Sequence, residues 1–183
     1  MERSEARRLV KNYVHRSNLY NHMLAVEAIM RLLAQHFSED IERWGSLGLL
    51  HDLDFEETYD KPQLHGTKSV EILEGQVDGE LLRAIRAHNY GYTGAKPVTK
   101  MEKALIAADA VSGLVIACAL VMPNKKLDEV RPEMVVRRLK EKDFARRCNR
   151  EHILYCEQLG LSWPQFAGLA LRALKTISGE LGL

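Results

Sequence analysis

The sequence predicts an all-α protein folded as one domain. Apolar residues recur at steps of three and four along most of the chain, which is the period of a helix with one buried face. No segment alternates apolar and polar residues for long, so no strand is predicted. The chain has 183 residues, no internal repeat and no convincing linker. That length is sufficient to bury one hydrophobic core.

The first predicted helix spans residues 18–37. Its apolar stripe consists of Leu19, His22, Val26, Ile29 and Leu33. A second helix is expected over 38–51, because Ser38, Glu39 and Asp40 provide an N-terminal cap and an acidic first turn. These two helices are therefore expected to be neighbours in the fold.

Polar and turn-forming residues divide the next part of the chain. Residues 54–63 are polar and contain a proline, so they are predicted to form a loop. Helices are expected over 65–73 and 78–89, each with a histidine on its apolar face. Residues 91–97 contain two glycines and a proline, which indicates another loop.

A long apolar helix is predicted to begin at Thr99, which can form a capping box with Glu102. Its apolar part, residues 104–122, is close to membrane-spanning length. It contains Asp109 near its middle, however, and an aspartate there costs roughly 2.5–3.5 kcal/mol on insertion. The segment is also rich in alanine and lacks flanking aromatic anchors. We therefore expect a central buried helix and no membrane association.

The C-terminal part, about 125–183, is predicted to add three helices, from Pro132 to about Lys140, over 143–158, and from Ser162 to near Gly179. Residues 125–150 include ten basic and five acidic residues. Only one aromatic residue lies among them, so a solvated helix surface is expected there and a nucleic-acid partner is not.

The composition places the protein in a general class. Lys and Arg number 26 and Asp and Glu 25, so no strong overall field attracts nucleic acid or membranes. The three cysteines form no CxxC motif, which indicates free thiols in a reducing compartment. The N-terminal residues are charged and unlike a signal peptide. A cytoplasmic location is expected.

Four polar residues are predicted to lie on otherwise apolar helix faces: His22, His51, Asp52 and Asp109. Buried carboxylates are normally paired or bound to a metal. Taken singly, each could be a hydrogen-bonded core histidine or an aspartate paired with an arginine. Together, two imidazoles and two carboxylates favour manganese, iron, nickel or zinc over magnesium and calcium. We therefore predict a metal site.

Two further histidines, His65 and His88, enlarge this set. Asp52 could bridge through its two oxygens to a second ion held by these histidines. Two ions roughly 3.5–4 Å apart stabilise both oxygens of an in-line displacement. Alternatively, His65 caps the helix that begins there and His88 interacts with a helix C-terminus. We favour the dinuclear interpretation.

The chain resembles the HD-domain superfamily, in particular its small bacterial members identified as metal-dependent phosphohydrolases. The resemblance rests on His22, on residues 48–53 with the sequence GLLHDL, and on residues 107–110 with the sequence AADA. It extends over residues 18–120. It implies a helical bundle whose ligands are His22, His51, Asp52 and Asp109.

The position of His65 and His88 is similar to that of the added histidines in two-metal subfamilies. The chain lacks the Gly-Tyr-Pro motif and the His-His pair of HD-domain phosphodiesterases, which argues against a cyclic-dinucleotide substrate. The full ligand set is also similar to that of HD-fold diiron oxygenases. A phosphohydrolase of small phosphate esters is favoured, with a diiron oxygenase or a signalling or binding module as alternatives.

Asp52 and Lys68 are the candidate catalytic residues. Lys68 lies one turn after His65 and could place its ammonium against a bound phosphate, or it could be a solvated surface residue. Weaker candidates for contacts with the substrate or its attacking water are Asp54, Glu56, Asn89, Tyr90 and Tyr92.

Overall fold

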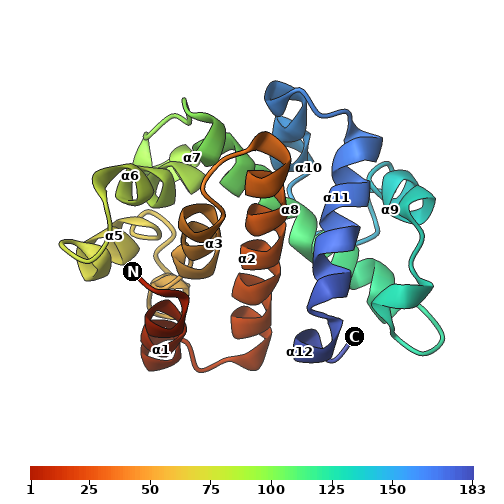
Figure 1. Cartoon of the computed structure of the whole chain (residues 1–183), viewed down its shortest axis with the longest axis horizontal. Helices are drawn as coiled ribbons and strands as arrows, with labels where there is room; N and C mark the ends of the chain where they lie inside the picture. Colours follow the sequence, from red (N-terminus) through yellow and green to blue (C-terminus); the bar gives the residue numbers. More distant parts are fainter.

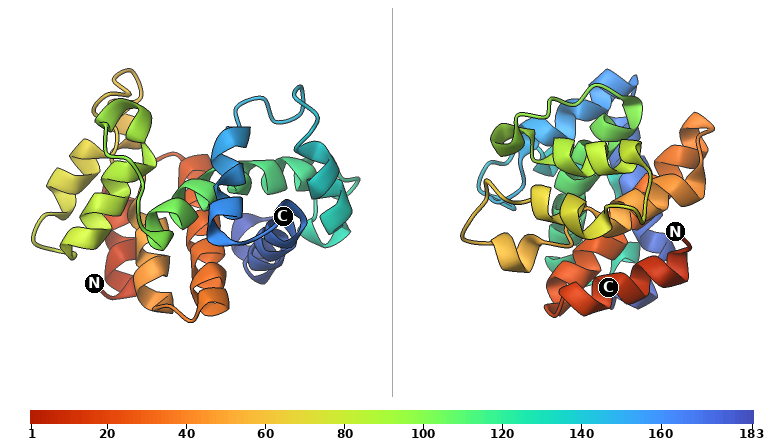
Figure 2. Two further views of the ribbon diagram at one scale, coloured as in Figure 1. Left: turned by 90° about the horizontal axis from the view of Figure 1, so that it is seen from above. Right: turned by 90° about the vertical axis from the view of Figure 1, so that its left-hand side faces the viewer.

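Three long helices organise the chain: α2 (Ser17–Phe37), α8 (Lys100–Leu120) and α11 (Trp163–Thr176). The computed structural model describes residues 1–183 and contains helices, turns and no strand, which confirms the all-α prediction. Figure 1 shows α2 at the centre, with α8 crossing behind it and α11 alongside. Figure 2 shows α8 running from one side of the molecule to the other.

Shorter helices surround this frame on both sides. On one side of α2 lie α1 (Arg3–Tyr13), α3 (Ile41–Leu50), α4 (Phe55–Thr58), α5 (Thr67–Leu73), α6 (Gly79–His88) and α7 (Tyr90–Thr93). The other side holds η1 (Leu127–Glu129), α9 (Pro132–Arg138), α10 (Arg150–Ile153), η2 (Leu154–Leu159) and α12 (Ser178–Leu181).

The starts of the main helices follow from their capping residues. The Asp40 side chain accepts a hydrogen bond from the backbone N–H of Arg43 at the start of α3. Thr99 and Glu102 form the predicted capping box at the start of α8. Such side chains satisfy N–H groups that have no partner within the helix. The local sequence therefore fixes where these elements begin.

Glycine allows α2 and α3 to approach closely. A Cβ atom added to Gly48 would lie 2.9 Å from the backbone of Glu27, which is closer than carbon atoms pack. No other residue fits there without a shift of one helix. This approach places the residues that follow Gly48 beside α2.

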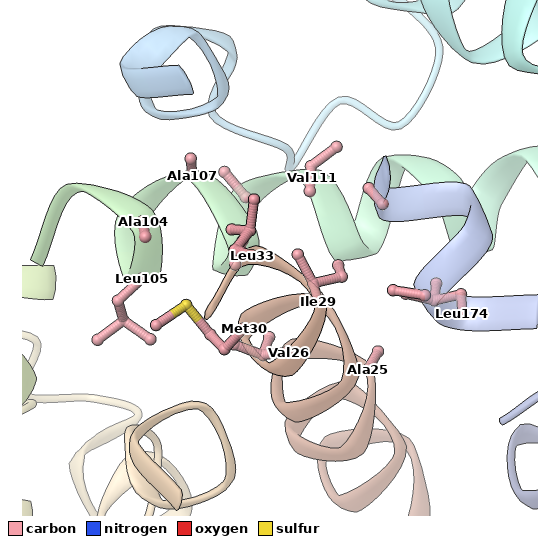
Figure 3. Close-up of a cluster of buried hydrophobic side chains, with 14 of the residues drawn as sticks. Ala25, Val26, Ile29, Met30, Leu33, Ala104, Leu105, Ala107, Val111 and Leu174 are labelled. Carbon is pink, nitrogen blue, oxygen red and sulfur yellow. The ribbon is translucent and has the colours of Figure 1, made fainter. Parts of the chain in front are cut away.

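A single hydrophobic core links the two sides, with members from Ala6 to Leu181. Figure 3 shows Ile29 and Leu33 of α2 packed near Val111 of α8. α8 is long and apolar enough to cross a membrane, but 61% of its most apolar window is buried inside the protein. This helix therefore forms part of the core, as predicted.

Several parts of the predicted secondary structure differ from the structure. The loops predicted over 54–63 and 91–97 contain the one-turn helix α4 and most of the one-turn helix α7, and the last predicted helix is divided into α11 and α12. Helix α1 was not predicted, because only Ala6 and Val10 of its residues are buried and its apolar stripe is short. The single helix predicted over 143–158 is wrong. The chain turns at Ala145, where φ is +46°, before α10 and η2 begin. The side chain of Arg150 donates hydrogen bonds to five backbone carbonyls in this turn, those of Leu139, Glu141, Phe144, Ala145 and Cys148.

Candidate metal centre

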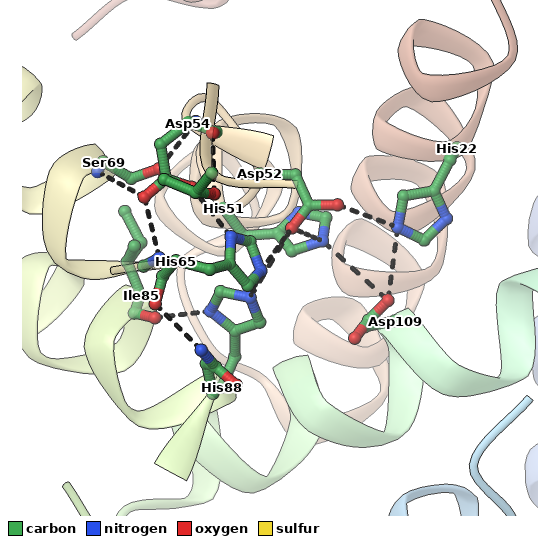
Figure 4. Close-up of polar contacts among 12 residues, drawn as sticks. His22, His51, Asp52, Asp54, His65, Ser69, Ile85, His88 and Asp109 are labelled. Carbon is green, nitrogen blue, oxygen red and sulfur yellow. Dashed lines mark hydrogen bonds and ion pairs between the residues drawn. The ribbon is translucent and has the colours of Figure 1, made fainter. Parts of the chain in front are cut away.

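The six predicted ligands converge at one place in the fold, as Figure 4 shows. They lie in α2, in the turn just after α3, in the turn just before α5, at the end of α6 and in the middle of α8: His22, His51, Asp52, His65, His88 and Asp109. Two groups have ligand atoms within 4.8 Å of one another, His22–His51–Asp52 and Asp52–His65–His88. The two groups share Asp52.

Asp52 lies between the histidines of both groups. Its Oδ1 is 3.3 Å from the Nε2 atoms of His51 and His65 and 3.5 Å from Nε2 of His88. Its Oδ2 is 3.5 Å from Nε2 of His22. The carboxylate thus faces both groups, which is the arrangement expected of a bridging ligand.

Asp109 completes the first group from the opposite side. Its Oδ1 lies 3.2 Å from Nε2 of His22 and 3.9 Å from Nε2 of His51. Burial alone would raise the pKa of Asp109, but the hydrogen bond and charge of His22 outweigh this effect and lower it. The aspartate is therefore ionised at neutral pH.

Hydrogen bonds on the far side of three imidazoles determine which nitrogen faces the centre. His51 Nδ1–H donates to the Gly48 carbonyl at 2.9 Å, and His88 Nδ1–H donates to the Ile85 carbonyl. His22 Nδ1–H donates to the Ser112 hydroxyl at 3.0 Å, because that hydroxyl itself donates to a backbone carbonyl. Each Nε2 can therefore present a lone pair toward the centre.

His51 provides the strongest indication that a cation belongs here. Its ring is fully buried, and its Nε2 has no hydrogen-bond partner. Burial lowers the pKa of His51 to about 4, so this nitrogen is an unprotonated acceptor at neutral pH. The oxygens nearest to it belong to the ionised Asp52 and Asp109. Acceptors that face one another in a buried site are costly unless a cation lies between them, and this donor set suits a divalent transition metal.

Asp54 orients His65 from behind. Its Oδ1 accepts a hydrogen bond from His65 Nδ1 at 2.8 Å, and its Oδ2 accepts from the backbone N–H groups of Gly66 and Ser69 at 2.8 and 2.9 Å. Burial alone would lower the pKa of His65, but Asp52 and Asp54 outweigh it and raise the pKa to about 10. Asp54 is 1% exposed, so it supports a ligand and does not orient water as considered from the sequence.

A pocket of about 310 Å³ opens onto the centre. His22, Asp52, His65 and Asp109 line its floor, and Arg16, Asn18, Leu19 and Phe55 line the rest of its wall. Neither Arg16 nor Asn18 was identified from the sequence, because nothing in the local pattern distinguishes them from other polar surface residues. Arg16 places its guanidinium 5.6 Å from the ring centre of Tyr59.

The remaining predicted contact residues lie elsewhere. Lys68 forms an ion pair with Glu57 and does not line the pocket, so its predicted contact with a substrate is not supported by its position. Glu56 accepts hydrogen bonds from the backbone N–H groups of His15 and Arg16 at 3.0 and 2.7 Å. It therefore stabilises the start of α2.

Asn89 and the two tyrosines also have other partners. The Asn89 amide donates to the carbonyls of Pro62 and His65 at 2.8 and 3.0 Å, which fixes the loop that carries a ligand. Tyr90 packs 5.4 Å from the ring of His152, and Tyr92 is 62% exposed. None of the three lines the pocket.

The family model described as HD domain matches residues 19–114, which is more than half of the chain. The matched segment includes all six side chains of the centre. Comparison with curated proteins and with solved structures gave no match.

Proposed function

The chain belongs to the HD-domain family, and on this premise we propose that it is a metal-dependent phosphohydrolase that cleaves small phosphate esters. HD domains are mostly metal-dependent hydrolases, and the cluster of histidines and aspartates fits a metal site. The observation that carries the proposal is the buried, unpartnered Nε2 of His51 opposite two carboxylates.

Six side chains would hold two ions. His22, His51, Asp52 and Asp109 would bind the first, and Asp52, His65 and His88 the second. Imidazole and carboxylate ligands favour manganese, iron, nickel or zinc. When bound, such ions supply Lewis acidity to a phosphoryl group and increase the acidity of water.

The residues of the pocket wall suit a phosphorylated ligand. Arg16 can donate two parallel hydrogen bonds to a phosphate at the mouth of the pocket, a geometry that lysine cannot provide. Asn18 adds a further polar group beside it. Leu19 and Phe55 form an apolar wall that excludes water from one side of the substrate.

The size of the pocket favours a small substrate. About 310 Å³ lies at the lower end of the range of small-molecule sites and accommodates one phosphorylated metabolite. We place this reaction in the cytoplasm, and neither a membrane nor a nucleic acid is part of it. The floor of the pocket carries the proposed metal ligands. At its mouth, the guanidinium of Arg16 would bind the phosphate.

The test combines metal analysis with an activity screen. Protein purified without added metal is analysed for manganese, iron, nickel and zinc. It is then incubated with each metal and a panel of small phosphate esters, and inorganic phosphate is measured. We expect phosphate release that needs metal and that His51→Ala abolishes. His36→Ala, which changes an exposed histidine outside the centre, is the matched control and should keep full activity.

Two other results would contradict the proposal. About two irons per chain, oxygen consumption and no phosphate release would indicate an oxygenase. Substoichiometric metal with no turnover, together with tight binding of a small anion that His51→Ala abolishes, would indicate a binding module.

A further inference from the structure

A second pocket lies at the junction of α1, α2, α11 and α12 and has a volume of about 400 Å³. Figure 1 shows α2 between α1 and α12 in this part of the molecule. The pocket uses residues 24, 28 and 31 of α2, which a helix of 3.6 residues per turn places opposite His22. It is therefore separate from the metal centre.

An adjoining hollow of about 440 Å³ continues this pocket along α2 and α11. The two share Leu32, Gln35 and Thr176, and the second adds His36 and Arg172. We refer to the pair as the α2–α11 groove. Its apolar lining includes Leu24, Ala28, Ile41, Ala173 and Ile177.

Part of the charge in the groove is already neutralised. The Glu27 carboxylate is buried, accepts hydrogen bonds from Arg3 and lies 3.5 Å from Arg31. Arg31 also binds the carboxylate of Glu42. These residues form a fixed frame, because their charges and most of their donors have partners.

Two other arginines have hydrogen-bonding capacity to spare. Arg7 donates from one terminal nitrogen to Glu180 at 2.6 Å, but its Nε is buried and has no partner. Arg172 is exposed and lines the second hollow. A buried donor without an acceptor costs roughly 1–3 kcal/mol, so a ligand that supplies the acceptor is favoured. Arginine is best matched by a carboxylate or a phosphate.

We propose that the α2–α11 groove binds a small organic anion. Its carboxylate or phosphate lies against Arg7, and its apolar body lies over Leu24, Ala28 and Ile177. Arg172 adds positive charge at the other end of the groove. This site is independent of the reaction at the metal centre.

Isothermal titration of the metal-loaded protein with octanoate and octyl phosphate tests this proposal, with 1-octanol as the neutral control. We expect one anion to bind per chain and octanol to bind at least roughly tenfold more weakly, because it lacks the charge that pairs with Arg7. Comparison of the two anions identifies whether carboxylate or phosphate is preferred. Absence of binding by both anions would overturn the proposal.

Three variants locate the binding. Arg7→Gln should weaken anion binding at least roughly tenfold, since it removes the charge-assisted hydrogen bond. Ala28→Phe should abolish binding by filling the groove while leaving every arginine in place. Arg146→Gln is the matched control, because it breaks an exposed ion pair with Asp143 outside the groove and should change nothing.

Circular dichroism and melting temperature establish that each variant is folded. Binding that persists in both Arg7→Gln and Ala28→Phe would show that the anion lies elsewhere. A His51→Ala protein should still bind it, and loss of binding in that protein would assign the anion to the metal centre and refute the proposal.

Discussion

Asp54 illustrates how a residue without metal contact can control a metal site. It accepts three hydrogen bonds, one from His65 and two from backbone N–H groups, so both the carboxylate and the imidazole are fixed. Such partners of metal ligands typically change metal affinity by about 10–100-fold. Binding of the proposed second ion should therefore depend on Asp54, although Asp54 would not contact that ion.

We predict that Asp54→Asn lowers the affinity for one of two ions by about 10–100-fold and leaves the other almost unchanged. The amide would present N–H groups to donors, so His65 would lose its fixed orientation. Metal content after gel filtration should fall from about two ions per chain to about one. Asp60→Asn, at an exposed position in the adjacent loop, is the control. Unchanged stoichiometry in Asp54→Asn would contradict this role.

The pKa values of the histidines predict how metal affinity depends on pH. Metal binds unprotonated imidazole, but the pKa of His65 is raised to about 10 and that of His22 is also raised above its usual 6.5. Near pH 7 an ion must therefore displace at least one proton. Affinity should rise about tenfold per pH unit for each proton released, and this rise should end near pH 10.

Titration with a competing fluorescent chelator between pH 6.5 and 8.5 measures this dependence. His65→Ala should reduce the slope by about one proton, since the most basic imidazole is absent. An affinity that does not change with pH in the unsubstituted protein would mean that both histidines are already neutral.

At the level of single residues, the sequence predicted which side chains converge at the candidate metal centre better than it predicted which residues line the pocket. The six candidate ligands could be selected because imidazoles and carboxylates on apolar helix faces are costly unless they bind something, and the structure brings all six together. The sequence could not show whether Arg16 or Lys68 faces the substrate, because a charged side chain at the surface is well solvated whichever way it points. Only the fold shows that Arg16 lines the pocket while Lys68 pairs with Glu57.

The contact between α2 and α3 is the element-level feature that positions the centre. Gly48 lets the two backbones approach, and its carbonyl holds His51. We predict that Gly48→Ala destabilises the protein by roughly 1–3 kcal/mol, because the added methyl group overlaps the backbone of Glu27. Thermal unfolding should show a lower melting temperature, and metal affinity should fall.

Gly168→Ala provides the matched control within α11. A Cβ added there meets nothing within 4 Å, so the better helix propensity of alanine should stabilise the protein by roughly 0.5–1 kcal/mol. If Gly48→Ala and Gly168→Ala changed the melting temperature equally, the contact with the backbone of Glu27 would not be the reason that position 48 requires glycine.

Helices with both a cap and a long apolar stripe were predicted correctly. α8 is the clearest case, since the Thr99–Glu102 capping box sets its start. The helix predicted over 143–158 was wrong because the conformation of this segment depends on Arg150. The guanidinium of Arg150 donates hydrogen bonds to carbonyls up to eleven residues away in the sequence. The spacing of apolar residues along a short stretch of sequence does not reveal such a contact. α1 was missed because it buries too few apolar residues to give a signal.

At the level of the whole molecule, the continuous core makes the C-terminal extension, residues 125–183, part of the same folding unit. α11 buries Trp163, Phe166, Leu169, Leu171 and Leu174. At about 1.5–3 kcal/mol for each large apolar side chain, these five contribute roughly 7–15 kcal/mol, which is comparable to the whole stability of a typical domain. The HD domain should therefore not fold without the extension, although the family match ends at residue 114.

We predict that a chain truncated after residue 124 loses cooperative unfolding. Removal of α11 would expose apolar residues of α2 and α8, the two helices against which α11 packs, to water. The truncated chain should be recovered mainly in the insoluble fraction. Any soluble material should melt without a sharp transition and bind a hydrophobic dye. Deletion of only Gly182 and Leu183 is the control and should leave the melting temperature almost unchanged. A truncated chain that melts cooperatively and retains its metal would instead establish residues 1–124 as an independent domain, because its core would then be complete without α11.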